Sequence, residues 1–237
     1  MPQALLAVSS EPGENVSLEE FQDWYNNEHV PIRLNHLSCF LTGARFEAAD
    51  AKSPSWLALY DIDDTSTFTD ESYTSLRKNR SPREADLIKR LELLDRRTYE
   101  TFLDSGESSR TSSLKYENPT RFLFTHGLQK QSADPADRDV EEWFKTTMKL
   151  NSTGSWVRTR VLKCIDNIKT GTKVDEGAES QNVPRYLVIH ELLDQSVRSS
   201  IEVSVSQASL SMEIVEARGW QLYRAYPCVA QGNVSSV

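Results

Sequence analysis

The 237-residue chain contains a faint internal repeat, and this repeat constrains the fold more than any other feature of the sequence. Residues 3–9 and 121–128 both have the composition of strands, and each segment is followed by a polar loop and an acidic helix start. Residues 54–62, Pro-Ser-Trp-Leu-Ala-Leu-Tyr-Asp-Ile, match residues 184–192, Pro-Arg-Tyr-Leu-Val-Ile-His-Glu-Leu. We therefore expect two structural units of the same kind in one chain.

Each half has the order strand, helix, strand, strand, helix, strand. Ser17 and Glu20 have the spacing of a helix capping box, and Asp139 and Glu142 are arranged in a similar way. The remaining strands are expected at residues 42–48, 96–102, 156–164 and 218–226. This order is that of a ferredoxin-like unit, whose four-stranded antiparallel sheet carries helices on one face. Two such sheets can bury their open faces against each other, which predicts an α+β fold with two ferredoxin-like repeats packed as an intramolecular, pseudo-dimeric barrel.

The sequence divides into four expected segments. The first repeat covers residues 1–104, a Ser-, Gly- and Glu-rich linker covers 105–118, the second repeat covers 119–228, and a flexible tail covers 229–237. The polar stretch 166–183 is expected to be a mobile insertion between strands of the second repeat.

Composition excludes several classes of function. The net charge of −8 argues against nucleic acid as a partner. The apolar runs are much shorter than the roughly 20 residues that span a bilayer, and the first residues lack the pattern of a signal peptide, so we expect a cytoplasmic protein without a membrane partner. Three scattered cysteines indicate neither a disulfide framework nor a metal site.

The run Trp-Tyr-Asn-Asn-Glu-His-Val-Pro-Ile-Arg at residues 24–33 is the most informative motif for function. Pro31 is expected to end a helix, which places His29 in the last helical turn. An imidazole titrates near neutral pH and can both take and give a proton, so His29 is the candidate catalytic residue. The alternative is a structural histidine that caps the helix carbonyls or binds across to the sheet.

Further candidates for substrate binding lie around this motif and on the strands. They are Tyr25, Arg33, Trp24, Glu28, Tyr60, His126 and His190. Trp24 and Tyr25 have packing as their alternative role, and Arg33 has an ion pair with Glu28 that would pin the turn. The side chains of His126 and His190 either face the barrel interior or point outward and are hydrogen-bonded. The sequence does not show to which face of its strand the Tyr60 side chain points.

The motif and the repeat together resemble the dimeric α+β barrel superfamily, and within it the EthD-like proteins. The residues that carry the resemblance are Trp24, Tyr25, Glu28, His29, Pro31 and Arg33, with topological support from strand 56–61. In the second half, Thr146 and Asn151 stand where Trp24 and His29 would be. The second repeat therefore looks like a scaffold without the signature, which predicts one site per chain. Fused forms of this kind resemble fungal proteins, some of them from secondary metabolism.

The resemblance implies a fold that supports many chemistries, from cofactor-free monooxygenases, dehydratases, decarboxylases and cyclases to haem-handling and non-catalytic proteins. The leading hypothesis is a cofactor-independent lyase or isomerase that uses His29 for dehydration, cyclisation or decarboxylation of a small aromatic or polyketide-like substrate. The alternatives are a haem-handling or monooxygenase barrel and a non-catalytic small-molecule-binding protein. The sequence lacks nucleotide-binding and hydrolase motifs, so no cofactor is expected. A homodimer is a further expectation.

Overall fold

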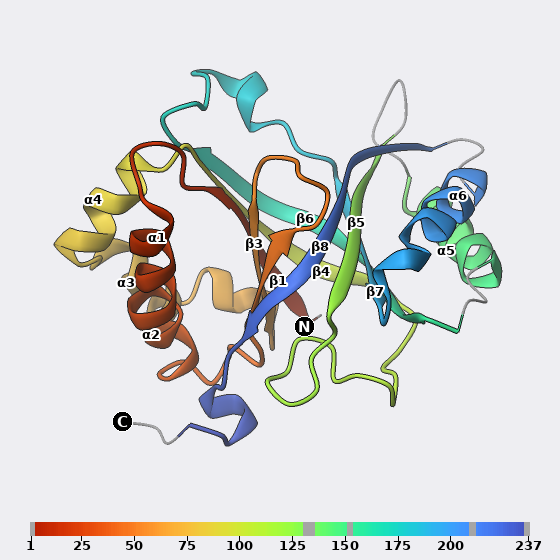
Figure 1. Cartoon of the computed structure of the whole chain (residues 1–237), viewed down its shortest axis with the longest axis horizontal. Helices are drawn as coiled ribbons and strands as arrows, with labels where there is room; N and C mark the ends of the chain where they lie inside the picture. The colour runs from red at the N-terminus through yellow and green to blue at the C-terminus, as the bar shows by residue number, and fades with distance from the viewer. Residues whose placement is uncertain (1–2, 130–135, 151–153, 209–211, 235–237) are drawn as a thin grey trace.

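The computed structural model describes residues 3–129, 136–150, 154–208 and 212–234, in which eight strands close into one barrel with helices on its outside (Figure 1). The strands are β1 (Ala4–Glu11), β2 (Ala44–Ala48), β3 (Trp56–Ile62), β4 (Leu93–Asp104), β5 (Phe122–Gln129), β6 (Trp156–Thr170), β7 (Tyr186–Leu192) and β8 (Glu213–Ala225). The helices are α1 (Leu18–Trp24), α2 (Pro31–Leu34), α3 (Glu71–Lys78), α4 (Pro82–Arg90), α5 (Asp137–Leu150) and α6 (Arg198–Ala208).

The strand order around the barrel shows the two predicted repeats. The first half contributes β4-β1-β3-β2 and the second half β8-β5-β7-β6, which is the same ferredoxin-like order twice. All pairs are antiparallel, and the halves join where β2 meets β8 and where β4 meets β6. The predicted α+β fold of two repeats in an intramolecular barrel is thus confirmed.

The central parts of most strands are buried on both faces, because one face lines the barrel interior and the other lies under helices, while β6 and β8 also carry exposed residues. Leu5, Leu59, Tyr99 and Trp220 belong to the interior cluster, which we call the lumen. Helices α1 to α4 cover the outer face of the first half, and we call this packing layer the first helix layer. Helices α5 and α6 cover the outer face of the second half, which forms the second helix layer (Figure 1).

The predicted linker 105–118 is more than a connection between the repeats. Leu114 within it is fully buried in the lumen cluster, and Ser113 donates a hydrogen bond to Glu191 of β7 (Oγ to Oε1, 2.6 Å). The linker therefore packs across one end of the barrel.

The predicted insertion 166–183 also differs from expectation. Strand β6 continues through Thr170, which pairs with Leu94 of β4. Beyond the strand, the side chain of Gln181 accepts from the backbone N–H of Lys169 (2.7 Å), and Asn167 donates to the Gln181 carbonyl (2.7 Å). These bonds tie the β6–β7 connection back onto its own strand, where it rises above the barrel in teal in Figure 1.

The end of the chain is partly structured. A 3-10 turn at Val229–Gln231 lies in the segment predicted as a tail, and Gln231 donates to the Leu41 carbonyl (3.1 Å). Residues 235–237 are outside the described part.

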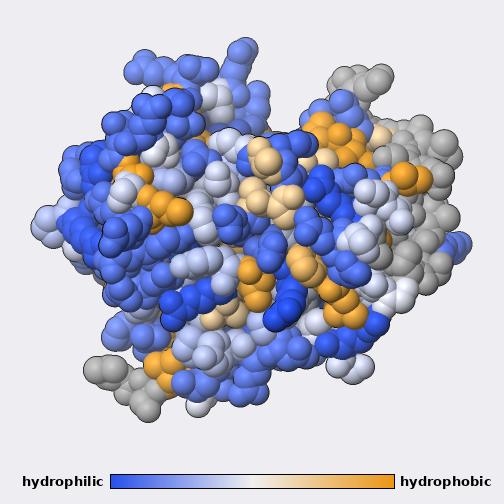
Figure 2. Space-filling view, in the orientation of Figure 1, coloured by the Kyte–Doolittle hydropathy of each residue, from blue (hydrophilic) through white to orange (hydrophobic). Residues whose placement is uncertain are grey.

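The outer surface is mostly polar on the face seen in Figure 2, where hydrophobic residues form small separate groups in a hydrophilic surface. Among the described helices, none combines the length and apolar character needed to cross a membrane.

Candidate functional site

The motif at residues 24–33 forms a helix with a wide turn in its middle. Helix α1 ends at Trp24, a π-helical turn covers Tyr25–His29, and α2 continues from Pro31. The N–H of Val30 donates to the carbonyl of Tyr25 (3.0 Å), five residues earlier. As predicted, the helical turn that carries His29 ends before Pro31. Pro31 then takes the first position of a new helix, α2, where its missing N–H is not needed. Single π turns occur frequently at functional sites.

This turn holds His29 against a buried carboxylate that the sequence analysis missed. His29 Nδ1 lies 3.3 Å from Oε1 of Glu84, and Trp24 Nε1 donates to the other oxygen of Glu84 (3.4 Å). The Glu84 side chain is 2% exposed and that of His29 is 13% exposed. Glu84 lies on α4, and its sequence signal, a capping-box position after Ser81, indicates only a helix start.

The protonation states of this pair follow from burial. Burial, assisted by the positive charge of Arg33, lowers the pKa of His29 to about 4, although Glu84 opposes the shift. The pKa of Glu84 is about 2, because its contacts with His29 and the charge of Arg33 outweigh its own desolvation. Near neutral pH the pair is therefore a neutral imidazole beside an ionised carboxylate.

The other motif residues surround this pair. The hydroxyls of Tyr25 and Ser10 share a hydrogen bond (3.2 Å), and the rings of Trp24 and Tyr25 lie 4.5 and 5.1 Å from the His29 ring. Arg33 donates from Nη1 to the His29 carbonyl (2.5 Å), so it fixes the turn through the backbone and not through the expected pair with Glu28.

Glu28 points to different partners. Its carboxylate accepts a hydrogen bond from Ser81, the N-cap of α4, and lies 3.6 Å from Arg83. Glu28 thus links the motif helix to the helix that carries Glu84, which gives it a structural role beside the predicted one.

Buried polar atoms without a hydrogen-bond partner gather in the first helix layer. They include Gln22 Oε1, Tyr60 Oη and Arg45 Nη2, and Arg45 stacks on the Tyr25 ring at 4.0 Å. His29 Nδ1 and Glu84 Oε1 face each other at 3.3 Å without the geometry of a hydrogen bond. Among the described residues of the second helix layer, only the Thr147 hydroxyl is in this state. Because unsatisfied buried groups are costly, their concentration in one layer is typical of a binding site rather than of packing.

His126 and His190 lie in the second helix layer and not in the lumen. Their Nε2 atoms are 3.2 Å apart, and His190 Nδ1 is 2.7 Å from the Thr159 hydroxyl. Trp143 of α5 packs on His126, and Phe124 stacks on His190. The interior-facing alternative is therefore wrong for both residues, and a substrate-binding role for them stays a prediction.

A haem does not fit these two histidines. His190 uses both ring nitrogens, and His126 Nδ1 lies near the Gly127 carbonyl (3.3 Å) while its Nε2 meets His190. An axial ligand needs a free ring nitrogen and an open space beside it, which this pair lacks. In the part of the chain that the structure describes, no group of three His, Cys, Asp or Glu side chains could hold a metal ion.

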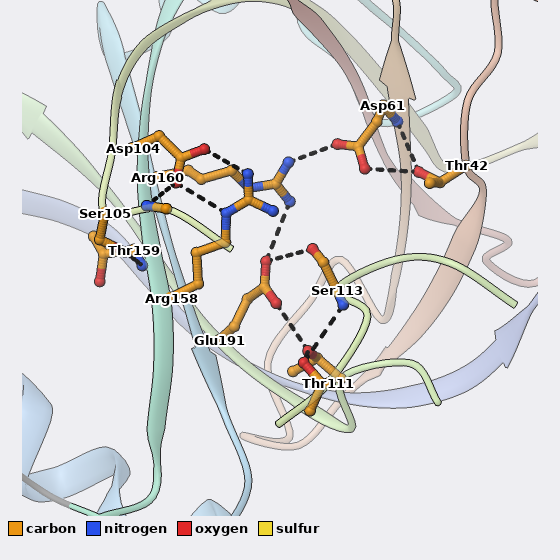
Figure 3. Close-up of polar contacts among 12 residues, drawn as sticks. Thr42, Asp61, Asp104, Ser105, Thr111, Ser113, Arg158, Thr159, Arg160 and Glu191 are labelled. Atoms are coloured by element: carbon orange, nitrogen blue, oxygen red, sulfur yellow. Dashed lines mark hydrogen bonds and ion pairs between the residues drawn. The ribbon is translucent and has the colours of Figure 1, made fainter. Parts of the chain in front are cut away.

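A second polar cluster closes the barrel end beside the linker (Figure 3). Arg160, 5% exposed at its side chain, donates to Asp61 (2.6 Å) and lies 3.5 Å from Glu191. Arg158 forms a bidentate ion pair with Asp104, in which Nε and Nη2 donate to the two carboxylate oxygens. A cavity of about 680 Å³ lies against this cluster. Both guanidinium groups of the cluster are paired with carboxylates, so we assign the cluster to closing the barrel.

The comparisons with known proteins show the fold. No protein-family model matches the chain, and no curated protein is similar to it in sequence. Among solved structures it is similar to an anthrone oxidase-like protein, with a TM-score of 0.65 and 8% identity over 100% of this chain and 96% of that one. It is also similar to a proposed monooxygenase from Fusobacterium nucleatum (TM-score 0.50, 7% identity, 95% and 94% covered). A heme-binding protein from Thermus thermophilus has a TM-score of 0.48 (9% identity, 93% and 91% covered).

At these identities the likeness concerns architecture alone. The fold is a closed eight-stranded barrel of two ferredoxin-like halves, both of which are supplied by one chain. Within this fold the residues of the sequence motif surround His29. The residue expected at the corresponding position of the second half, Asn151, lies outside the described residues.

Proposed function

We propose that this protein is a cofactor-independent, EthD-like enzyme in which His29 removes a proton from a small aromatic or polyketide-like substrate. One observation carries the proposal: a neutral imidazole is held against the buried, ionised carboxylate of Glu84 at a π-helical turn. A lyase or isomerase of this kind suits a fungal protein of secondary metabolism. The barrel closes within one chain, so the expected homodimer would use an outer surface and stays a prediction.

The arrangement favours proton transfer from carbon. A neutral imidazole accepts the proton, and the Glu84 carboxylate stabilises the imidazolium that results. The electron pair moves onto a neighbouring carbonyl oxygen and forms an enolate, which needs hydrogen-bond donors. We assign that task to Tyr25, Arg33 and Tyr60, of which Tyr60 carries a buried hydroxyl without a partner. Trp24 offers an aromatic surface, and Glu84 is a positioning residue.

Anthrone is a suitable first substrate, because it is a flat aromatic ketone with an acidic methylene group and because the chain is similar in fold to an anthrone oxidase-like protein. In D2O without oxygen, proton removal and return replace the methylene hydrogens by deuterium, which proton NMR follows directly. We expect the protein to accelerate this exchange and His29→Asn to lower the protein-dependent rate by about 100-fold or more. Glu84→Gln should lower it less.

His36→Asn is the matched control. His36 is an exposed histidine of the same segment, and its replacement should leave the exchange rate unchanged. Full exchange activity in His29→Asn would rule out the role assigned to this residue. An absence of protein-dependent exchange with anthrone and with related enolisable ketones would instead favour the non-catalytic alternative.

Admission of oxygen separates the lyase or isomerase class from the monooxygenase alternative. In an oxygenase, the anthrone carbanion reacts with O2 so that anthrone and O2 give anthraquinone and one water. Protein-dependent exchange without protein-dependent oxygen consumption would support the lyase or isomerase class, while stoichiometric anthraquinone formation would support the monooxygenase.

A further inference from the structure

The lumen contains a cavity that is separate both from the His29 site and from the cavity beside the Arg160 cluster. Its volume is about 470 Å³, and it lies at the barrel end opposite the Arg160 cluster. Neither His29 nor Glu84 lines it. The cavity runs from the surface, where Lys173 is 68% exposed, to the fully buried side chains of Leu59 and Tyr99. Small-molecule sites typically have volumes of about 300 to 1,000 Å³.

The inner walls of this cavity are apolar and partly aromatic. Leu57, Leu59, Leu187 and Ala7 line it together with the ring of Trp220, whose Nε1 already donates to Thr125 (2.8 Å). Such walls favour a flat apolar ligand, since each group of this ligand would leave water for an apolar surface.

One inner group remains unsatisfied. The Tyr99 hydroxyl is fully buried and has no hydrogen-bond partner among the described residues. Burial raises the pKa of Tyr99, although nearby Arg97 opposes the shift, so the hydroxyl keeps its proton and can donate it. A guanidinium offers only donors, so Arg97 cannot accept this proton. The group that completes the site is therefore a hydrogen-bond acceptor.

Three of the four cations that line the mouth of the cavity are paired with carboxylates, and the fourth, Lys169, donates to the Asn182 carbonyl (2.7 Å). Arg97 binds Asp95 and Glu216 (2.6 and 2.7 Å), and Lys173 binds Glu92 (2.8 Å). Arg218 likewise binds Asp50 (2.9 Å) and stacks over the Trp220 ring at 4.5 Å. Because carboxylates hold these cations, the mouth offers little to an anionic ligand and suits a neutral one.

We propose that the lumen cavity binds a neutral, planar aromatic ketone, whose carbonyl oxygen accepts a hydrogen bond from Tyr99 while its rings lie against Trp220 and the lumen leucines. The site is a binding site beyond the proposed catalytic function. It involves no residue of the first helix layer, so ligand binding in the lumen and proton transfer at His29 can be tested independently of each other.

The test uses a matched pair of ligands with the full chain. 9-Fluorenone has three fused rings and one carbonyl, and fluorene has the same rings without it. Equilibrium dialysis should show that the protein binds both. Tyr99→Phe should weaken fluorenone binding by about 3- to 10-fold, the value of one hydrogen bond, and leave fluorene within about twofold. Infrared spectra should show a lowered carbonyl stretching frequency for bound fluorenone that returns toward the unbonded value in Tyr99→Phe.

Tyr73→Phe is the matched control, because it also removes a buried tyrosine hydroxyl, but from the first helix layer, where this hydroxyl accepts from Arg96 Nε (3.2 Å). It should leave both affinities unchanged. Ala7→Phe places a ring inside the cavity and should remove binding of both ligands. The proposal is overturned if neither ligand binds, if Tyr99→Phe affects both ligands equally or not at all, or if a folded Ala7→Phe protein still binds fluorenone.

Discussion

At His29, two charged neighbours act in opposite directions on one imidazole. Glu84 favours the protonated form and Arg33 disfavours it, while burial lowers the pKa more than either charge changes it. The surroundings of His29 therefore keep its ring neutral near neutral pH. Substitution of either charged neighbour should change the pKa of His29.

Arg33→Met should raise the pKa of His29 from about 4, because it removes a positive charge that disfavours the imidazolium. The chain has four histidines, so NMR can follow each ring signal through a pH titration. Arg33→Lys keeps the charge and should leave the pKa near the wild-type value. Equal pKa values in wild type and Arg33→Met would contradict the electrostatic account.

A general base must be neutral to work, so the pH profile follows from the same pKa. Protein-dependent anthrone exchange should be independent of this group above about pH 5 and should fall as the pH drops through about 4. In Arg33→Met this acidic limb should move to higher pH. A limb near the ordinary histidine pKa of about 6.5 in the wild type would contradict the burial of His29.

Residue types at the site were predictable from the sequence, but their partners were not. His29, Trp24 and Tyr25 come together because they are neighbours on one helix. Glu84 reaches His29 only through the packing of α4 against the motif helix, which no local pattern encodes. The same holds for Ser10, which meets Tyr25 across the layer.

At the scale of elements, α4 connects the site to the rest of the first helix layer. Its N-cap, Ser81, accepts from the N–H of Glu84 (3.0 Å) and donates to Glu28 of the motif helix. One hydroxyl thus fixes both the start of α4 and its position relative to His29.

Ser81→Ala should cost about 1 kcal/mol of stability and should also lower the anthrone exchange rate, since Glu84 loses its fixed position. The matched control is Asp70→Ala, which removes the N-cap of α3, where the Asp70 side chain accepts from Ser72 (2.8 Å). It should cost a similar free energy in chemical denaturation while leaving the exchange rate unchanged. Equal effects of both variants on the rate would mean that the loss is general destabilisation.

The strands were predictable because apolar runs of strand composition recur in the same order in both halves of the sequence, but the faces of the strands were not. In a closed barrel under helices, one face of each strand meets the lumen and the other meets a helix layer. Apolar residues therefore occur on both sides, and hydropathy cannot tell whether His126 or Tyr60 points inward or outward. The π turn was missed for a related reason, since the sequence shows where Pro31 stands but not how the backbone accommodates it.

At the scale of the whole molecule, three buried histidines connect folding to pH. His29 and His126 have pKa values near 4, and that of His190 lies well below its ordinary value, in each case chiefly because burial disfavours the charged ring. In the unfolded chain all three titrate near 6.5. Between about pH 6.5 and 4 the unfolded state therefore binds more protons than the folded state.

The free energy of unfolding should consequently fall as the pH is lowered from 6.5 toward 4, with a limiting slope of about 4 kcal/mol per pH unit for three groups. Glu84, with a pKa of about 2, should extend the loss to lower pH, because its stabilisation is present above its unfolded value of 4.5 and disappears on protonation. Urea denaturation at several pH values measures this slope. His36→Asn should not change it, and a stability that is flat from pH 7 to 5 would show that these rings are solvated.

The buried linker has a consequence for how the two halves depend on protein concentration. Because residues 105–118 join the two halves of the barrel in one chain, these halves meet within a single molecule, and Leu114 and Ser113 anchor the connection across one barrel end. Association of the halves is therefore a first-order event, and dilution cannot separate them as it separates the subunits of a two-chain barrel. Each half can also change without imposing the same change on a symmetry mate, which gives a physical basis for a chain that keeps the His29 signature in one repeat and not in the other.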